Sequence, residues 1–168
     1  VTSNRDWFDD IQESRNQCSG LILENNGIEL LILTNYATIR NAERIILTFY
    51  AGEQAEAQLE QYDPSTGLAV VSAELSDLPY ELEEEKPSIA ALGSSNGNLP
   101  GTPVIAMGSP MGVSGSVGYG IVTASGSQLS LTDRNYNLLL TDIVGSRSAS
   151  GVLFNLQGQL VGIITNNK

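Results

Sequence analysis

Residues 21–33 read LILENNGIELLIL, in which two apolar runs flank the tripeptide Asn25-Asn26-Gly27. Asn and Gly accept a positive φ at little steric cost, so this tripeptide predicts the turn of a β-hairpin. We expect strands over residues 21–24 and 28–33 on either side of it. The stretch decides the fold class, because the rest of the chain repeats its pattern of short apolar runs and tight turns.

Further strands are predicted from this pattern along the chain. The run AEAQLE at residues 55–60 contains good helix formers, but its brevity, its alternation of apolar and polar residues and its neighbours favour a strand. One helical turn is expected near residues 9–15. Short strands joined by Gly-rich turns indicate a barrel or a sandwich. The remaining predicted strands cover residues 44–50, 68–71, 103–107, 120–124, 128–131, 138–140 and 159–165.

An acidic segment bracketed by prolines interrupts the strands. Residues 78–87 read LPYELEEEKP, and a charged, proline-flanked run of this kind is typical of a linker. We therefore predict an N-terminal lobe over residues 1–80, an acidic linker over 81–90 and a C-terminal lobe over 91–168. Each lobe is expected to contain about six strands.

Composition excludes several classes of function. The chain has 168 residues and a formal net charge of −11, which argues against nucleic acid and anionic membrane surfaces as partners. Cys18 is the only cysteine, so an internal disulfide is excluded and a buried, unreactive thiol is expected. No apolar run reaches transmembrane length, and no cofactor or metal is predicted. The chain begins at Val1 and ends at Lys168 without a signal peptide, as expected of a fragment of a longer protein.

The segment SASGVLFN at residues 148–155 offers Ser148 and Ser150 as candidate nucleophiles. At neutral pH a serine nucleophile needs a positioned base to take its proton, and that base is nearly always a histidine. The chain contains no histidine. A lysine base is also disfavoured, because the chain offers only Lys86 in the acidic linker and the terminal Lys168. Hydrolysis by a Ser-His-Asp triad within this chain is therefore excluded.

Several motifs follow one another in an order that resembles a known family. They are TNYAT at residues 34–38, DPSTGLAVV at 63–71, GSPMG at 108–112, GIVT at 120–123, and LTD at 140–142 followed by SGVLFN at 150–155. In this order they resemble the HtrA/DegP branch of the trypsin-like (chymotrypsin-fold) serine proteases, from Cys18 to Ile164. The resemblance implies an all-β fold of two six-stranded antiparallel β-barrels.

The resemblance also assigns the catalytic positions. The histidine position falls on Ala37, the aspartate position on Gly67 and the nucleophile position on Ala149. One residue is missing from the loop before the nucleophile position, so Ser148 or Ser150 in that slot stays open as an alternative. Neither serine has a base. The domain is therefore predicted to be a catalytically inactive homologue, a pseudoprotease, through natural degeneration or engineered inactivation.

Peptide or protein binding, or regulation, is the favoured function. A chymotrypsin-type fold holds an extended peptide along a sheet edge by main-chain hydrogen bonds, which do not depend on the triad. The binding cleft is expected between the lobes. Its candidate residues are Tyr36, Gly145, Ser146, Arg147, Ser148 and Ser150. The alternatives are a structural or oligomerisation platform of a larger envelope protein and a weak or residual serine endopeptidase.

The resemblance implies further properties of the full-length protein. HtrA-like proteases typically trimerise through the protease domain and carry a PDZ domain after it, so a homotrimer and a PDZ domain outside this chain are expected. Their location implies an extracytoplasmic place in the cell envelope, with a membrane anchor in the full-length protein. Trp7 and Phe8 are expected to pack into their own core or to cover a neighbouring subunit. Asp142 is expected to be a structural turn residue.

Overall fold

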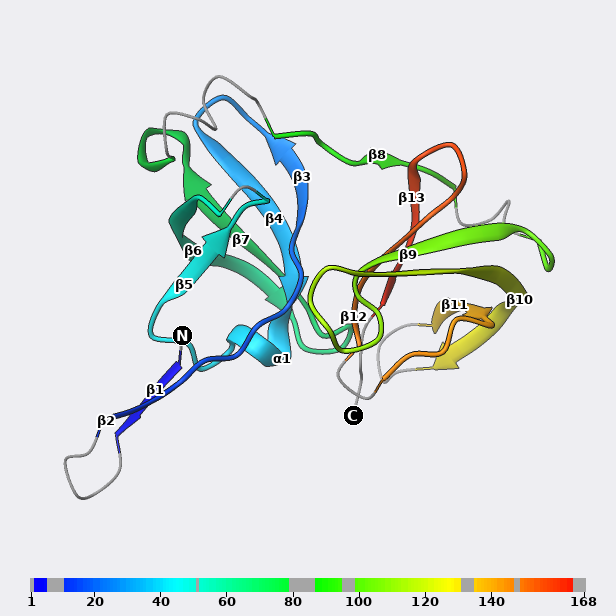
Figure 1. Cartoon of the computed structure of the whole chain (residues 1–168), viewed down its shortest axis with the longest axis horizontal. Coiled ribbons are helices and arrows are strands. Elements are labelled where there is room, and N and C mark those ends of the chain that lie inside the picture. Colours follow the sequence, from blue (N-terminus) through cyan, green and yellow to red (C-terminus); the bar gives the residue numbers. More distant parts are fainter. Residues whose placement is uncertain are drawn as a thin grey trace. The chain divides into compact units, whose positions relative to one another are not determined.

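The computed structural model describes residues 2–5, 11–50, 52–78, 87–94, 99–130, 135–146 and 149–164. The chain forms two compact units, Val1–Ile89 and Ala90–Lys168. Both units are built from β-strands, and the helical segments among the described residues, α1 (Tyr36–Ile39) and η1 (Leu75–Asp77), are short (Figure 1). The predicted all-β class is therefore confirmed.

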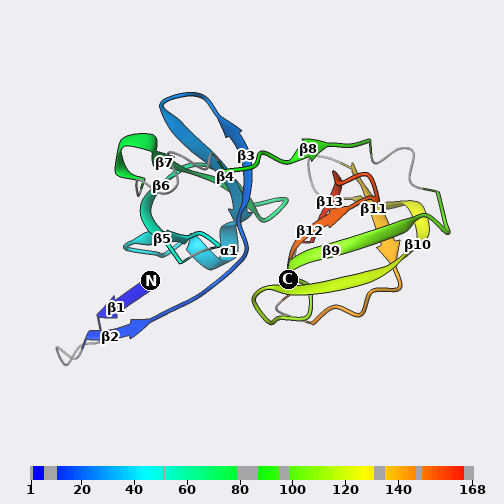
Figure 2. The same cartoon turned by 45° about the horizontal axis from the view of Figure 1, so that its top comes forward.

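The first unit contains a five-stranded antiparallel sheet that curls on itself (Figure 2). Its strands lie in the order β3-β4-β7-β6-β5. The predicted hairpin around Asn26 is confirmed as β3 and β4, and the AEAQLE run is confirmed as part of β6. The strand bounds are β3 Leu21–Asn25, β4 Glu29–Asn35, β5 Ile45–Thr48, β6 Gln54–Asp63 and β7 Leu68–Glu74.

A separate hairpin precedes this sheet. β1 (Thr2–Arg5) and β2 (Ile11–Ser14) pair only with each other, so the helical turn predicted near residues 9–15 is wrong. An isolated helix of that length is marginal, whereas strand pairing satisfies backbone groups of both segments at once. Because these strands form their own sheet, the curled sheet of the first unit has five strands within the described residues, where about six were expected. Trp7 and Phe8 lie outside the described residues.

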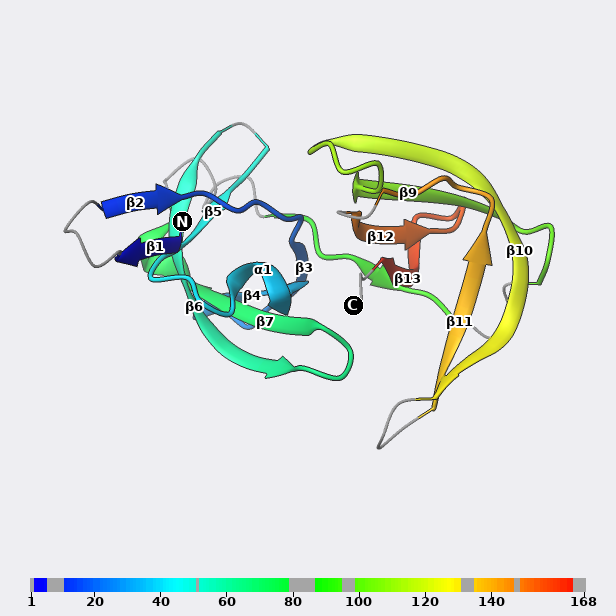
Figure 3. The ribbon, with the colours of Figure 1, turned by 90° about the horizontal axis from the view of Figure 1, so that it is seen from below.

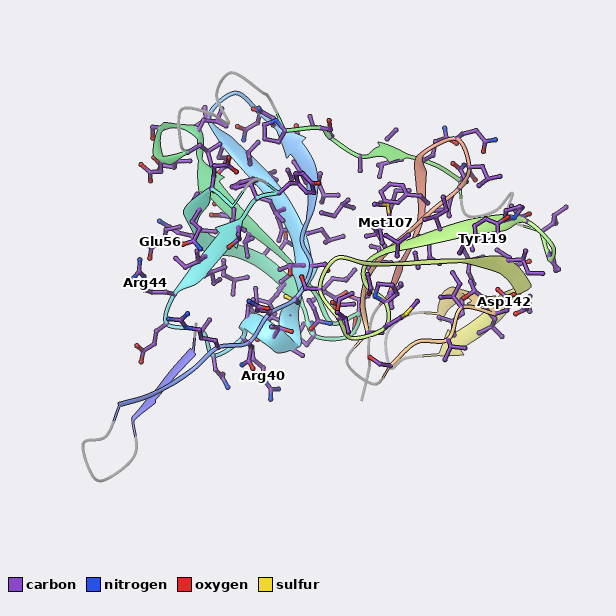
Figure 4. The ribbon with its side chains drawn as sticks, in the orientation of Figure 1. Arg40, Arg44, Glu56, Met107, Tyr119 and Asp142 are labelled. Carbon is purple, nitrogen blue, oxygen red and sulfur yellow. The ribbon has the colours of Figure 1, made fainter. Side chains whose placement is uncertain are left out.

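The core of the first unit combines large side chains from β4 with small ones from β6 and β7. Leu30 and Ile32 point into it, as the alternating burial along β4 requires. Alanines on the inner face of adjacent strands leave room for the sheet to curl around these larger residues. On the outer face, Arg44 Nη2, just before β5, lies 3.1 Å from Glu56 Oε2 of β6 in an exposed ion pair (Figure 4). The small core residues are Ala55, Ala57, Ala69 and Ala73.

The pairing of β4 with β7 places two predicted site segments at one end of the sheet. Asn35, the last residue of β4, pairs with Leu68, the first residue of β7. Helix α1 therefore begins where the turn before β7 ends. Residues that lie far apart in the chain, at the TNYAT and DPSTG motifs, become neighbours through this register.

The second unit contains a six-stranded sheet in the order β11-β10-β9-β12-β13-β8. The edge pair β13–β8 is parallel, so the prediction of fully antiparallel strands is wrong at this edge. The short β8 is joined to β13 by a long stretch of chain, and only a hairpin connection would impose antiparallel pairing. The core is formed by Val104, Ala106, Val122, Leu153 and Val161. The strand bounds are β8 Ala91–Leu92, β9 Pro103–Ser109, β10 Ser116–Ser130, β11 Asn135–Thr141, β12 Ser150–Phe154 and β13 Gln159–Ile164.

β10 runs as one strand through a region that was predicted as two. Its register against β11 shifts between Val122 and Ala124 and again between Ser125 and Ser127. Gly126, inside the second shift, has a φ of 82°. Bulges at these points bend a strand without ending it, and Figure 3 shows β10 as a continuous curve. β12 was not predicted, because the Ser-Gly pair at its start hides the strand pattern.

Two predictions of organisation are not tested by the fold. Residues 81–86 of the predicted linker lie outside the described residues, and the lobe boundaries at 80 and 91 stay predictions. In the described part of the chain, no helix has both the length and the apolar character needed to span a membrane.

Candidate functional site

Helix α1 carries the position that the resemblance assigns to histidine. Asn35 caps this helix, since its Oδ1 accepts a hydrogen bond from the backbone N of Thr38 at 3.3 Å. A capping side chain of this kind satisfies a backbone donor that has no partner within the first helical turn. Ala37 lies on the helix and is exposed. The position therefore offers solvent a methyl group and no group that can accept a proton.

The turn between β6 and β7 carries the aspartate position. Asp63 Oδ1 accepts hydrogen bonds from Ser65 N at 2.8 Å and from Ser65 Oγ at 2.6 Å. These hydrogen bonds, led by the one from the hydroxyl, lower the pKa of Asp63. Gly67 closes the turn with a φ of 71°, a conformation that strains residues with a side chain. The carboxylate in this turn is thus engaged in holding the backbone.

A backbone hydrogen bond joins these two segments. Tyr36 N donates to Gly67 O at 2.8 Å, which ties the residue before Ala37 to Gly67 itself. The structure therefore brings the predicted histidine and aspartate positions together at one end of the first unit. In a triad, this is the arrangement in which a carboxylate orients an imidazole. Here the two positions carry a methyl group and a hydrogen atom.

Tyr36, a predicted cleft residue, stacks on a partner that the sequence did not reveal. Its ring lies 4.3 Å from that of Tyr62, centroid to centroid, with an interplanar angle of 2°. Partial burial and, after it, the interaction with Tyr62 raise the pKa of Tyr36. Tyr62 is the second-last residue of β6, beyond the part of the strand where buried and exposed residues alternate. Only the cross-strand register, which a single sequence does not contain, would have pointed to it.

The nucleophile position lies in the second unit, directly before β12. Ser146 N donates to Pro110 O at 3.3 Å, and Ala149 N donates to Ser146 O at 3.1 Å. Ala149 is 5% exposed. Gly145 lies beside it, since a Cβ on Gly145 would be 3.7 Å from the Ala149 Cβ. The structure therefore brings Gly145, Ser146 and Ala149 together against the turn that follows β9.

Ser150 begins β12 and pairs with Ser109 of β9. It is 7% exposed, so its hydroxyl is almost withdrawn from solvent. The next residue, Gly151, has a φ of 135°, and a Cβ there would overlap the carbonyl oxygen of Met107. Only glycine permits this close approach of two strands. Ser150 is therefore nearly buried at the start of β12.

The remaining predicted residues fall into two groups. Arg147 and Ser148 lie outside the described residues. Asp142 Oδ1 accepts a hydrogen bond from Ile121 N at 2.7 Å, which fits the expected structural role at the β10–β11 pair (Figure 4). Cys18 is partly rather than fully buried, with its Sγ 3.1 Å from Thr34 Oγ1. The thiol lies shortly before β3, beside the hydroxyl of Thr34 near the end of β4.

Comparison with known proteins gives a consistent result. A family model described as the trypsin-like peptidase domain matches residues 18–163. A probable periplasmic serine endoprotease, DegP-like, of Pseudomonas fulva is 34% identical over 154 residues, which cover 90% of this chain and 29% of that protein. The putative serine protease HhoA of Synechocystis sp. is 32% identical over 155 residues, covering 89% of this chain and 36% of that protein.

A solved structure of an HtrA-type protease, AlgW with a decapeptide, superimposes with a TM-score of 0.67 at 31% identity. The match covers 87% of this chain and 42% of that one. Together with the family match, it shows the trypsin-like protease fold. The chain itself spans only 29% and 36% of the length of the two curated relatives.

Proposed function

The chain belongs to the trypsin-like peptidase domain family, and we propose that within this family it binds polypeptides without cleaving them. One observation carries the proposal: the whole chain lacks histidine, and alanine stands at the histidine position of the family motif. Tyr36 and Gly67 are bonded next to that position, so the surrounding backbone is in place while the base is absent. Without a base, a serine hydroxyl stays protonated and is a weak nucleophile at neutral pH.

The backbone of the nucleophile loop supports the same proposal. An oxyanion hole needs the N–H of the nucleophile residue free to bind the charge that develops on the substrate oxygen. Ala149 N donates instead to Ser146 O at 3.1 Å. This internal hydrogen bond competes with any substrate oxygen for the same donor. This competition supports the proposal that the loop does not stabilise a transition state.

Polypeptide binding needs neither a catalytic base nor an oxyanion hole. Strand addition uses backbone hydrogen bonds along a sheet edge and side-chain pockets beside it. The AlgW structure, which was solved with a decapeptide, supports a polypeptide as the ligand class for this chain as well. A relative named as periplasmic supports an extracytoplasmic location.

Catalytic inactivity is tested with casein and a fluorogenic peptide library, with trypsin as the positive control. A serine-reactive phosphonate followed by mass spectrometry reports any activated hydroxyl. We expect no cleavage above background and no covalent adduct. Labelling of Ser148 or Ser150 would overturn the inactive assignment, because it would reveal a base that the sequence does not show.

Binding is tested on a peptide array with a steric block on the first unit. Ala37 is exposed, so Ala37→Trp adds bulk beside Gly67 without filling the core. Ala91, exposed in β8, gives the matched control Ala91→Trp. We expect Ala37→Trp to reduce peptide binding at least tenfold and Ala91→Trp to leave it unchanged. Equal binding by the unmodified chain and Ala37→Trp would refute a binding role for this segment.

The homotrimer, the PDZ domain and the membrane anchor implied by the family resemblance remain proposals for the full-length protein. Multi-angle light scattering on residues 1–168 tests self-association directly. A strict monomer at high concentration would count against an oligomerisation platform within this domain.

A further inference from the structure

Tyr36 and Tyr62, here called the tyrosine pair, form a parallel stack at the end of the first unit. Their ring centroids are 4.3 Å apart and their planes differ by 2°. Tyr62 is 50% exposed, although its cross-strand partner Ala69 is only 2% exposed. A large aromatic ring at a core-facing position of β6 is thus half open to solvent. This leaves aromatic surface available for a ligand.

The tyrosine pair is bonded to the segment on which the proposed function depends. Tyr36 begins α1 immediately before Ala37, and its backbone N donates to Gly67 O at 2.8 Å. Tyr62 precedes Asp63, whose carboxylate holds the turn that ends at Gly67. The pair therefore stands on two short, hydrogen-bonded elements. A platform fixed in this way loses little conformational entropy when a ligand stacks on it.

The charges around the tyrosine pair limit which kind of side chain a ligand can place there. Arg40, at the end of α1, lies near enough to Tyr36 for its positive charge to favour the tyrosinate and so oppose the rise in the Tyr36 pKa. A second cation beside this guanidinium would be repelled. The unit as a whole has seventeen acidic and five basic residues, a net charge of −12, which disfavours a carboxylate ligand. An uncharged planar side chain meets neither penalty.

We propose that the tyrosine pair is a docking platform for one aromatic side chain of the bound polypeptide. This rests on the proposed function and adds the chemistry that the ligand presents at the first unit. A phenyl ring continues the stack on the open side of Tyr62 in an offset arrangement. Such contacts favour an aromatic over an aliphatic side chain of similar size by about threefold to tenfold.

The test uses two small probes that differ only in the side chain, N-acetylphenylalaninamide and N-acetylleucinamide. Binding is followed by the NMR shifts of the tyrosine ring protons. We expect the phenylalanine probe to shift the Tyr36 and Tyr62 signals and to bind about threefold to tenfold more tightly than the leucine probe. Equal binding of the two probes would overturn the platform.

Two substitutions at Tyr62 distinguish a requirement for an aromatic ring from a requirement for apolar volume. Tyr62→Phe keeps the ring and is expected to bind the phenylalanine probe within twofold of the unmodified chain. Tyr62→Leu keeps apolar bulk and is expected to lose the preference for phenylalanine. Tyr50, fully exposed at the β5–β6 turn, gives the control Tyr50→Leu, which is expected to change nothing. An equal loss in Tyr50→Leu would mean non-specific contact and refute the proposal.

The peptide array distinguishes failure of this inference from failure of the proposed function. Array binding without an aromatic preference would refute the platform and leave polypeptide binding standing. Probe binding that Tyr62→Leu removes, with no binding on the array, would support the platform and refute polypeptide binding. An aromatic preference on the array that disappears in Tyr62→Leu would support both.

Discussion

The segment around Ala37 in the first unit is held by side-chain hydrogen bonds, whereas the segment around Ala149 in the second unit is held by close backbone contacts. Asn35 caps α1 and Asp63 binds Ser65 in the first case. In the second, Gly151 lies where any Cβ would overlap the Met107 carbonyl. Capping side chains can be exchanged for others that accept the same hydrogen bond, but a contact that only glycine permits has no substitute.

The two units also differ in net charge. The second unit has two acidic and three basic residues, a net charge of +1, against −12 for the first, and together these give the −11 of the whole chain. All the glutamates lie in the first unit. We therefore expect polar and charged side chains to matter more for the stability of the first unit, and close backbone packing to matter more for the second. Four substitutions, given in order of decreasing effect, test this contrast.

The largest effect is expected from Gly151→Ala in the second unit. The new methyl group must displace β9 at Met107, and φ at 135° is unfavourable for alanine. We expect a loss of about 4 kcal/mol in the free energy of unfolding, measured by urea denaturation. Gly158→Ala is the matched control, because Gly158 has a φ of 75° but open space around it. The control should lose about 1–2 kcal/mol, and equal losses would show that backbone conformation alone, without the close contact, explains Gly151.

A smaller effect is expected from Asn35→Ala in the first unit. This change removes the acceptor for Thr38 N and leaves a backbone donor of α1 without its cap. We expect a loss of about 1 kcal/mol in the free energy of unfolding, and Asn35→Asp should restore most of it. Asn41→Ala, at an exposed position after the helix, provides the control. A loss as large as that of Gly151→Ala would contradict the contrast between the units.

A gain of stability is expected from Glu74→Lys. Glu74 in β7 pairs directly with Glu29 in β4, so two like charges face each other across the sheet. Lysine at position 74 makes the pair opposite in charge and should raise the free energy of unfolding by about 0.5 kcal/mol. Glu43→Lys makes the same charge change in a loop. If both variants gained equally, net charge rather than the cross-strand pair would be the cause.

The smallest effect, and one that depends on pH, is expected from Ser65→Ala. The hydrogen bonds from Ser65 lower the pKa of Asp63 in the folded chain. A lowered folded pKa gives stability above the unfolded value of about 3.9, and that stability is lost as the pH falls through the folded pKa. In Ser65→Ala the pKa of Asp63 should rise towards its usual value, as carboxyl NMR titration would report. The stability difference from the unmodified chain should be present at neutral pH and vanish in acid, and an unchanged titration would rule out this role for Ser65.

Local sequence predicted most of the fold. The hairpin of β3 and β4 follows from turn chemistry within a few residues, and β6 follows from its own alternation. β10 was divided in two because bulges around Gly126 depend on its register with β11. The helical turn near residues 9–15 failed for a related reason, since β2 forms only by pairing with β1. Both errors occur where pairing with another strand, rather than the segment's own residues, decides the backbone conformation.

Some features of the candidate site were likewise predicted from the sequence, and others were not. Motif order assigned Ala37, Gly67 and Ala149, and these assignments to catalytic roles stay predictions. Tyr62 was missed, because its stacking on Tyr36 arises from the end of one strand meeting the start of a helix. The hydrogen bond from Ala149 N to Ser146 O was also not predicted, because residue types alone do not specify the backbone geometry of a loop.

The residue types alone show that the chain has no histidine to serve as a base. A chain without histidine has none in any conformation, and an alanine or glycine offers no proton acceptor however it is placed. Which groups meet depends on the fold, as in the contacts of Tyr36 N with Gly67 O, of Tyr36 with Tyr62, and of the Gly151 backbone with Met107. Composition is the same in the folded and unfolded chain, whereas contacts between residues far apart in sequence exist only when strand register and packing bring them within a few ångströms.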